Sequence, residues 1–314
     1  MDVCSRGLPH LHFDRGQMSS CDGGVKTTQL TFQLRDGSSN LPPSLQLLET
    51  EIISTPLFII DTKKIYVEKV SAGMIAKLQP KMSKAIWRPA PGRKLGFIVW
   101  HENDMLGVAF LASPVINMGA RDLFLNLPKD PSLKGKELRH YADLSVCVST
   151  QPIGWHWNVG KLIALLATTF GDYWLDQYKD ELKGIVTTSL WGRGTQYNRV
   201  YKFLGYTKGY GHEHINDENY HKMLEWMRQN KIDIPSCKFG AGSNPRMRRI
   251  AAYKKASGDK SVNLKHEKIR GIYYHPSVDP NTRQQIIEDW YKRWGFNRYQ
   301  KTMEINPPYL TGLT

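Results

Sequence analysis

Residues 94–113 read KLGFIVWHENDMLGVAFLAS, two apolar runs separated by the polar tetrapeptide HEND. Polar turn residues at the point where both runs stop predict a β-hairpin. Further on, ADLSVCVST at 142–150 and GIVTTSL at 184–190 predict two more strands. Helices are expected at 158–170, 172–182, 195–204 and 218–229. A hairpin followed by alternating strands and helices predicts an α/β (α+β) fold, in which helices flank a mixed β-sheet.

The rest of the chain has weaker signals. Residues 120–127, ARDLFLNL, alternate like a short strand, and residues 238–270 are expected to form a basic loop. A strand at 268–276 and a helix at 281–295 should follow that loop. The first 40 residues have no sustained periodicity, which is typical of a mobile tail. The expected organisation is a tail at 1–40, a core at 41–215 and a basic C-terminal extension at 216–314.

The charge of the chain points to a polyanionic partner. The 314 residues include 43 Lys and Arg against 29 Asp and Glu, a formal net charge of +14. Ten of those cations and only two acidic residues lie in 238–270. We expect this segment to bind double-stranded DNA or another nucleic acid. The alternative is a solvated basic face with no partner. The candidate DNA-binding cations are Arg246, Arg248, Arg249, Lys254 and Lys255.

Nothing in the sequence predicts membrane insertion or export. The longest apolar run, LIALLA at 162–167, is far shorter than the roughly 20 residues of a membrane span. The N-terminal residues lack the apolar core of a signal peptide. The expected location is therefore the cytoplasm. The sequence does not specify an oligomeric state.

A helix start at 158–161 is the candidate anion site. Asn158 is a favourable N-cap residue, and Gly160 allows close approach to the backbone. Free N–H groups and the helix dipole would favour a diphosphate beside Asn158, Val159, Gly160 and Lys161. An ordinary capped helix is the alternative. The chain contains no GxxxxGK[ST] phosphate loop.

The order of these elements resembles that of the GNAT acyltransferase superfamily. A strand, an anion-binding turn, a helix and a strand are followed by Y-x-x-x-G-[FY], here Tyr201 to Tyr206. The resemblance implies a GNAT-like core with acyl-coenzyme A or a related donor on Asn158, Val159, Gly160 and Lys161. It also implies that Tyr201 or Tyr197 acts as a general acid. The chain departs from the superfamily pattern where Trp155 and Asn158 replace the usual polar residue and glycine.

A closer resemblance covers residues 94–212. The motifs that carry it are Arg121-Asp122, Asp143-Leu144-Ser145, Trp174 with Tyr178, Gly194-Thr195 with Tyr197, and Leu204-Gly205 with Thr207, Gly209 and Gly211. In these motifs the chain resembles the DruA family of the Druantia anti-phage system and, more distantly, the Mom family of phage DNA-modifying proteins. The Mom resemblance implies a transferase that modifies an exocyclic amine of a DNA base. The DruA resemblance alone is equally consistent with a non-catalytic nucleic-acid-binding component of a phage or anti-phage system.

Transfer to a base amine would require a proton acceptor and a means of reaching the base. Asp143 and Asp122, beside Arg121, are the candidate carboxylates. Arg121 and Asp122 could instead form an internal ion pair. Stacking on a flipped base is expected of Trp155, His156 and Trp157, although such residues are more often part of a core. His212 and His214 could share one face of a strand, but no third ligand is identifiable, so no metal site is expected.

Overall fold

The computed structural model describes most of the chain after residue 53. The described residues are 54–55, 57–84, 87, 91–190, 192–193, 195–209, 211, 215–237, 244–264 and 269–305. The tail expected at 1–40 lies outside this part of the chain.

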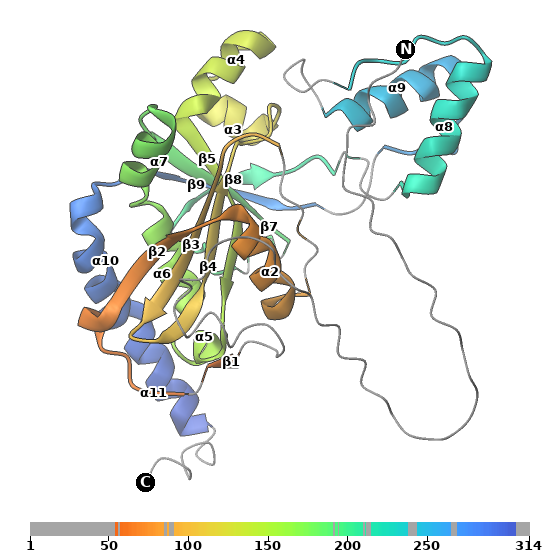
Figure 1. Ribbon diagram of the computed structural model, residues 1–314. Helices are drawn as coiled ribbons and strands as arrows, with labels where there is room; N and C mark the ends of the chain where they lie inside the picture. The colour runs from red at the N-terminus through yellow and green to blue at the C-terminus, as the bar shows by residue number, and fades with distance from the viewer. Residues whose placement is uncertain are drawn as a thin grey trace, which may run out of the picture.

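Seven strands form one mixed sheet in the order β2-β3-β4-β5-β7-β9-β8 (Figure 1). Strands β5 and β7 are parallel, and the other neighbouring pairs are antiparallel. The strands are β2 (Ile65–Val70), β3 (Lys94–His101), β4 (Asp104–Ala112), β5 (Tyr141–Ser149), β7 (Gly184–Ser189), β8 (Lys202–Tyr206) and β9 (Gly271–Pro276). A separate pair consists of β1 (Ser54–Thr55) and β6 (Gln151–Pro152). The sheet confirms the predicted mixed α/β class.

Strands β3 and β4 form the predicted hairpin. His101 pairs with Asp104 across the turn, in which Glu102 has a left-handed φ of 52°. Almost every side chain of the two strands is buried, on both faces of the sheet. Burial on both faces explains why each run is continuously apolar rather than alternating.

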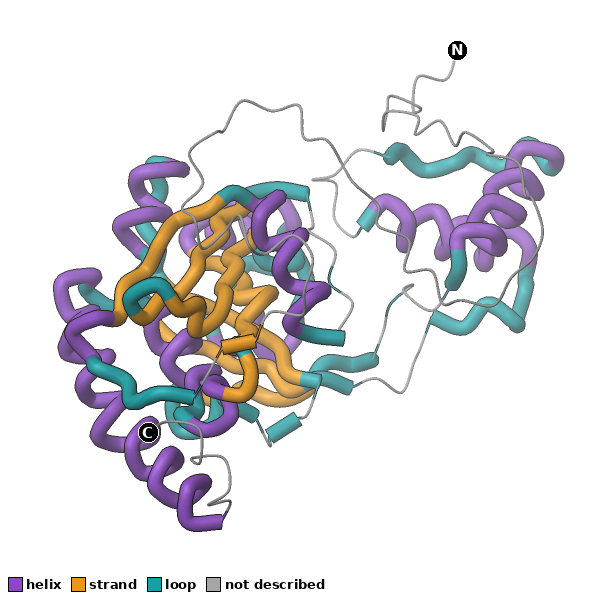
Figure 2. Tube along the Cα trace, turned by 60° about the horizontal axis from the view of Figure 1, so that its bottom comes forward, coloured by secondary structure: helices purple, strands orange, loops and turns teal. Residues whose placement is uncertain are grey.

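Helices cover both faces of the sheet (Figure 2). On one face, α6 (Val159–Ala167) packs against β4 and β5 within the larger apolar cluster. On the other, α2 (Ala72–Met82) packs against β3, β4 and β5 within a second apolar cluster. The remaining α-helices are α3 (Gly119–Phe124), α4 (Pro131–Glu137), α5 (Ile153–His156), α7 (Gly171–Tyr178), α8 (Asp217–Gln229), α9 (Pro245–Ser257), α10 (Arg283–Trp290) and α11 (Phe296–Ile305).

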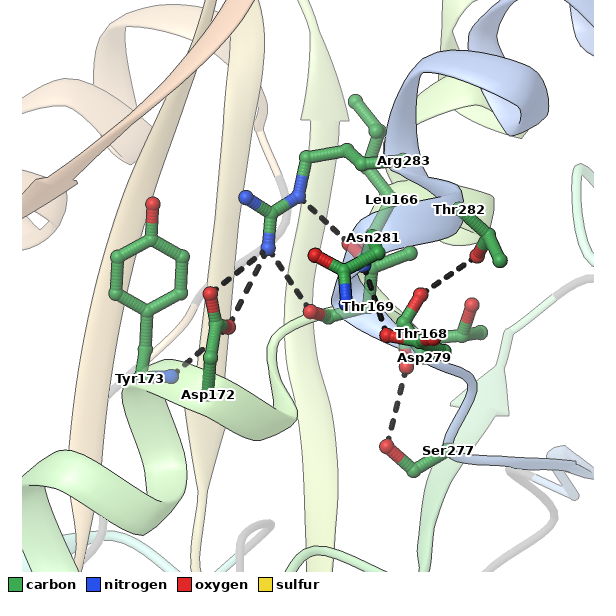
Figure 3. A network of polar contacts seen from close by, with 10 residues as sticks. All are labelled: Leu166, Thr168, Thr169, Asp172, Tyr173, Ser277, Asp279, Asn281, Thr282 and Arg283. Carbon is green, nitrogen blue, oxygen red and sulfur yellow. Dashed lines mark hydrogen bonds and ion pairs between the residues drawn. The ribbon is translucent and has the colours of Figure 1, made fainter.

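A polar network ties α10 to the junction of α6 and α7 (Figure 3). Arg283 donates from Nε to the hydroxyl of Thr169 at 3.0 Å and from Nη2 to the carbonyl oxygen of Thr169 at 2.9 Å. The same guanidinium contacts the carboxylate of Asp172 at 3.3 Å. These bonds connect the C-terminal helices to the core over more than 100 residues of sequence.

The short strand predicted at 120–127 is wrong, because most of these residues lie in helix α3. Arg121 is completely buried and donates to the carbonyl oxygens of Val115 and Ile116. Leu123, one of the alternating apolar residues, is 84% exposed. The alternation therefore does not mark a core face, and the buried arginine determines the local structure.

The helix expected at 195–204 is also wrong. Residues 195–200 form turns, and residues 202–206 form strand β8. This strand pairs with β9 from Lys202–Tyr274 to Tyr206–Gly271, with a bulge at which Gly205 has a φ of 141°. Pairing with β9 satisfies the backbone N–H and C=O groups of this segment. The helical spacing of the sequence does not reveal this long-range pairing.

The expected boundary at residue 215 does not separate two units of the sheet. Strand β9 lies between β7 and β8, and α10 and α11 pack against the elements around α6. A π-helical turn, Tyr291–Gly295, joins these two helices. The C-terminal third therefore completes the core.

Between the neighbouring antiparallel strands β8 and β9, residues 211, 215–237 and 244–264 form an inserted module. Its two ends meet where Gly211 N–H donates to the carbonyl oxygen of Leu264 at 3.0 Å. Helices α8 and α9 lie apart from the sheet in Figure 1, around a small cluster that contains Ile250 and Val262. The basic loop expected at 238–270 is thus wrong for 245–257, which form α9. Asn244 caps that helix by accepting from Arg246 N–H at 2.8 Å.

In the described part of the chain, we find no helix whose length and apolar character would let it cross a membrane.

Candidate functional site

The parallel strands β5 and β7 pair only at their beginnings. Their register runs from Tyr141–Gly184 to Asp143–Val186, although β5 continues to Ser149. Beyond that point, side chains replace backbone pairing. Thr187 Oγ1 donates to the carbonyl oxygen of Leu144 at 2.8 Å. Gln196 Nε2 donates to the carbonyl oxygen of Cys147 at 2.8 Å. This divergence of β5 and β7 brings together two of the predicted catalytic residues, Asp143 and Tyr197.

Asp143 is the last residue of β5 that pairs with β7, and it is partly buried. Burial raises the pKa of its carboxyl group to about 7, against the opposing charges of Arg121 and Arg270. Among the described residues, no group donates a hydrogen bond to this carboxylate. A carboxyl group that is half protonated near neutral pH can both accept and release a proton. Asp143 is therefore the best proton acceptor of the predicted set.

We expect Asp143→Asn to change the pH dependence of stability. The folded pKa lies above the ordinary value of 3.8, so the native state binds more protons than the unfolded state between about pH 4 and 7. The wild type should therefore lose stability as the pH rises through this window, by up to about 1.4 kcal/mol per pH unit relative to Asp143→Asn. Urea unfolding of both proteins at pH 5, 6, 7 and 8 measures the difference. Parallel curves for the two proteins would contradict the raised pKa.

Arg121 and Asp122 form an internal ion-pair network. Asp122 accepts from Arg121 Nε at 2.9 Å, from Lys134 Nζ at 3.0 Å and from Met118 N–H at 3.2 Å. Burial acts to raise the pKa of Asp122, but the hydrogen bonds from Arg121 and Lys134 outweigh it, and the pKa is lowered. A fully ionised, multiply bonded carboxylate is a weak base. The geometry thus matches the ion-pair alternative for these two residues.

Of the two tyrosines, only Tyr197 lies at the divergence. The Tyr201 hydroxyl donates to the carbonyl oxygen of Ala164 at 2.8 Å inside the main apolar cluster. The Tyr197 hydroxyl lies near the Cys147 thiol and interacts with Thr187 and Gln196. Burial raises the pKa of both phenols above their ordinary range. Both residues are almost completely buried, so neither hydroxyl is open to solvent.

The turn expected to bind an anion is covered by the chain itself. Asn158 occupies the predicted N-cap position of α6, but it has a left-handed φ of 57° and its side chain makes no capping bond. Gly160 faces Gln196, whose Oε1 would lie 2.2 Å from any Cβ at that position. The Lys161 amine donates to the carbonyl oxygens of Gln196 at 3.0 Å and Asn198 at 2.5 Å. Val159 is fully buried.

These contacts do not fit a coenzyme A pyrophosphate in the arrangement described. The space beside Gly160 contains the Gln196 side chain, and the ammonium group of Lys161 is already bonded to two carbonyl oxygens. In this structure, the turn fixes the 195–201 segment against α6.

The three residues expected to stack on a base differ in exposure. Trp157 is fully buried, stacks on Tyr299 with ring centroids 4.3 Å apart and donates from Nε1 to the Phe58 carbonyl oxygen at 3.0 Å. His156 is buried beside Thr302, with 2.9 Å between Nδ1 and Oγ1. Trp155 is 48% exposed, under the guanidinium of Arg298. Trp157 and His156 are therefore core residues, the alternative to base stacking, and of the three only Trp155 presents its ring to solvent.

Several basic side chains of α9 are bonded within the inserted module. Arg246 donates to the carbonyl oxygens of Ile215 and Asn216 and contacts the carboxylate of Asp217. Three further cations donate hydrogen bonds to neutral backbone carbonyl oxygens: Arg248 to that of Ser236, Arg249 to that of Pro235 and Lys254 to that of Val262. Lys255 is exposed. The carbonyl partners orient these cations without cancelling their charge.

Two residues of the site were missed by the sequence analysis. Gln196 lies within the GTQYNR segment, but a neutral glutamine carries no signal of its role between β5 and α6. Arg270, whose charge acts on Asp143, directly precedes β9 and was counted only as part of the basic segment. His212 and His214 lie outside the described residues. Within the described residues, no three His, Cys, Asp or Glu side chains are grouped to hold a metal ion.

Comparison with known proteins gives two matches. A family model described as "Druantia protein DruA" matches residues 84–288, a range that includes both diverging strands and the inserted module. The chain is 29% identical over 209 residues to the Druantia protein DruA of Escherichia coli (strain UMEA 4076-1), an alignment that covers 58% of this chain and 50% of that protein. The chain thus spans about half the length of this relative. No solved structure matches.

Proposed function

We propose, from the premise that this chain belongs to the Druantia protein DruA family, that it is a nucleic-acid-binding component of an anti-phage defence system. The observation that carries the proposal is helix α9 of the inserted module. Its 13 residues include five Lys and Arg and no acidic residue. Such a concentration of positive charge is favourable only next to a polyanion or in open solvent.

The internal contacts of α9 support this reading. Arg249 and Lys254 donate to neutral carbonyl oxygens, so these contacts hold both side chains in place while their charges remain. Arg246 has a carboxylate partner in Asp217. Backbone carbonyl partners fix the module without reducing its electrostatic attraction for phosphates.

One face of α9 is suited to close approach. Arg248, Ala251, Ala252 and Lys255 are spaced three or four residues apart, so they share one side of the helix. Ala251 and Lys255 are exposed. Small side chains between two cations would allow the helix backbone to come near the phosphates of double-stranded DNA. The test is the affinity for duplex DNA as a function of salt, with variants of this face.

A second candidate function is a DNA-base modifying transferase, and Asp143 is the observation that favours it. Its carboxyl group, with a pKa of about 7, lies where β5 and β7 part. In such a reaction the amine nitrogen would bond to the transferred group as the bond between that group and its donor breaks, and the donor's leaving group would depart with the bonding electrons. The carboxylate would take the proton that the amine loses. An acyl-coenzyme A donor at the turn of α6 would require Gln196 to leave Gly160.

The transferase candidate predicts a modified nucleoside in DNA from cells that express the protein. Mass spectrometry of digested DNA should show a new nucleoside with the wild type and none with Asp143→Asn, while duplex binding is the same for both. The conservative change leaves the shape of the site and removes the proton acceptor. Unmodified nucleosides with both proteins, together with intact DNA binding, would eliminate the transferase and leave the binding function.

A further inference from the structure

The solvent side of α6 carries a cavity that the proposed function does not use. Its volume is about 470 Å³, within the range of small-ligand sites. The apolar part of its wall consists of Leu165 of α6, Ile286 and Trp290 of α10, and Trp294 of the π-helical turn. The polar part consists of Asp289, Lys292 and Arg293. The partly exposed indole of Trp294 and the cationic rim are well suited to a ligand with a flat ring and negative charge.

Positive charge is concentrated around Trp294. The Arg293 guanidinium carbon lies 4.6 Å from the centre of the Trp294 ring, and the Lys161 amine lies 5.8 Å from it. Burial and then the charges of Arg199 and Arg293 lower the pKa of Lys161 to about 8. The positive charges of these side chains repel one another, and an anion bound beside Arg293 would offset that repulsion.

The backbone around the cluster is irregular in two places. Arg199 has a left-handed φ of 65°, uncommon for a residue with a side chain. The chain from Tyr291 to Gly295 makes a π-helical turn, a feature that occurs often at functional sites. Trp290 is held against the start of α6, since its Nε1 donates to the Asn158 carbonyl oxygen at 3.3 Å. The π-helical turn places Lys292 and Arg293 in the wall of the cavity.

We propose that this cavity binds a free nucleotide, with the base against the indole of Trp294 and the phosphates beside Lys292 and Arg293. A nucleoside di- or triphosphate combines the planar apolar part and the dense negative charge that the two parts of the wall require. Asp289 is the carboxylate among the lining residues and offers an acceptor to a ribose hydroxyl. The proposal rests on the cavity and not on DNA binding by α9.

Calorimetric titration of the full chain with ADP, ATP, adenosine and inorganic pyrophosphate tests the site. ADP and ATP should bind, and adenosine and pyrophosphate should each bind at least about tenfold more weakly because each lacks one half of the ligand. Arg293→Gln and Trp294→Ala should each weaken ADP binding by about tenfold or more. Trp294→Phe should restore much of the loss, because it retains an aromatic surface. Lys301→Glu, an exposed change on α11, is the matched control and should have no effect.

Three results would overturn the proposal. The first is that no nucleotide binds at about 1 mM. The second is that neither Arg293→Gln nor Trp294→Ala changes the affinity for ADP. The third is that pyrophosphate binds as tightly as ADP, which would indicate a plain anion site. Binding of single-stranded oligonucleotides but not of ADP, lost in Arg293→Gln, would identify a strand as the phosphate source and would also exclude a free nucleotide. Lys255→Glu in α9 should not alter ADP binding, so failure of the DNA-binding proposal is measured separately.

Discussion

Ala251→Glu combined with Lys255→Glu should weaken binding of a short DNA duplex by about a hundredfold at low salt. The pair removes one exposed cation from α9 and adds two carboxylates to the same helix face, where they would face the phosphates. Glutamate is a strong helix former, so α9 should keep its structure. Fluorescence anisotropy with a labelled duplex measures the affinity, and circular dichroism checks the helix content.

The chain supplies a closely matched control. Ala76 and Lys77 are exposed on α2, and Ala76→Glu with Lys77→Glu alters the net charge by the same amount. If DNA binding depended only on net charge, the two double variants would lose affinity equally. The inserted module is the binding surface only if the α9 variant loses far more affinity than the α2 variant.

Arg121→Leu should reduce the free energy of unfolding by about 3 to 5 kcal/mol, the largest stability loss we expect from a single change. The guanidinium is completely buried and satisfies the carbonyl oxygens of Val115 and Ile116 as well as the carboxylate of Asp122. Leucine removes the donor of both carbonyl oxygens and leaves Asp122 with only Lys134 and the Met118 N–H, and unsatisfied buried polar groups are costly. Denaturant unfolding of the variant and the wild type gives the difference.

Arg139→Leu is the comparison for that change. Arg139 pairs with Asp180 at 3.2 Å, but more than half of its side chain is exposed. An exposed ion pair contributes at most about 1 kcal/mol, so the loss should be small. If Arg121→Leu were as stable as Arg139→Leu and instead abolished a DNA modification, the role of Arg121 would be catalytic rather than structural.

The sequence predicts the central elements of this fold well because their signals are local. The hairpin of β3 and β4, strands β5 and β7, and helices α6 and α8 all follow from apolar runs bounded by polar or turn residues. Residues 202–204 of β8 were predicted as the end of a helix at 195–204 because apolar spacing over so few residues fits a helix or a strand. Their strand structure depends on pairing with β9, which lies about 70 residues further along the chain.

The candidate site was only partly predictable for a similar reason. Asp143 was identified from its strand motif, and the structure places it where the parallel strands part. Lys161 donates to the carbonyl oxygen of Gln196, and the Gln196 side chain faces Gly160. These contacts join residues 35 or more positions apart, so no local pattern predicts them. The basic residues of α9 were recognised by type, but the carbonyl oxygens that orient Arg249 and Lys254 belong to residues of no distinctive character.

The salt dependence of duplex binding tests the central proposal most directly. For the wild type, a plot of the logarithm of the association constant against the logarithm of salt concentration should have a slope of about −3 or steeper, because several phosphate contacts release counterions. The α9 double variant should have a slope shallower by about 1 and a much lower affinity, whereas the α2 variant should resemble the wild type. A wild-type slope near zero, or equal affinities for the wild type and the α9 variant at every salt concentration, would contradict nucleic-acid binding by the inserted module.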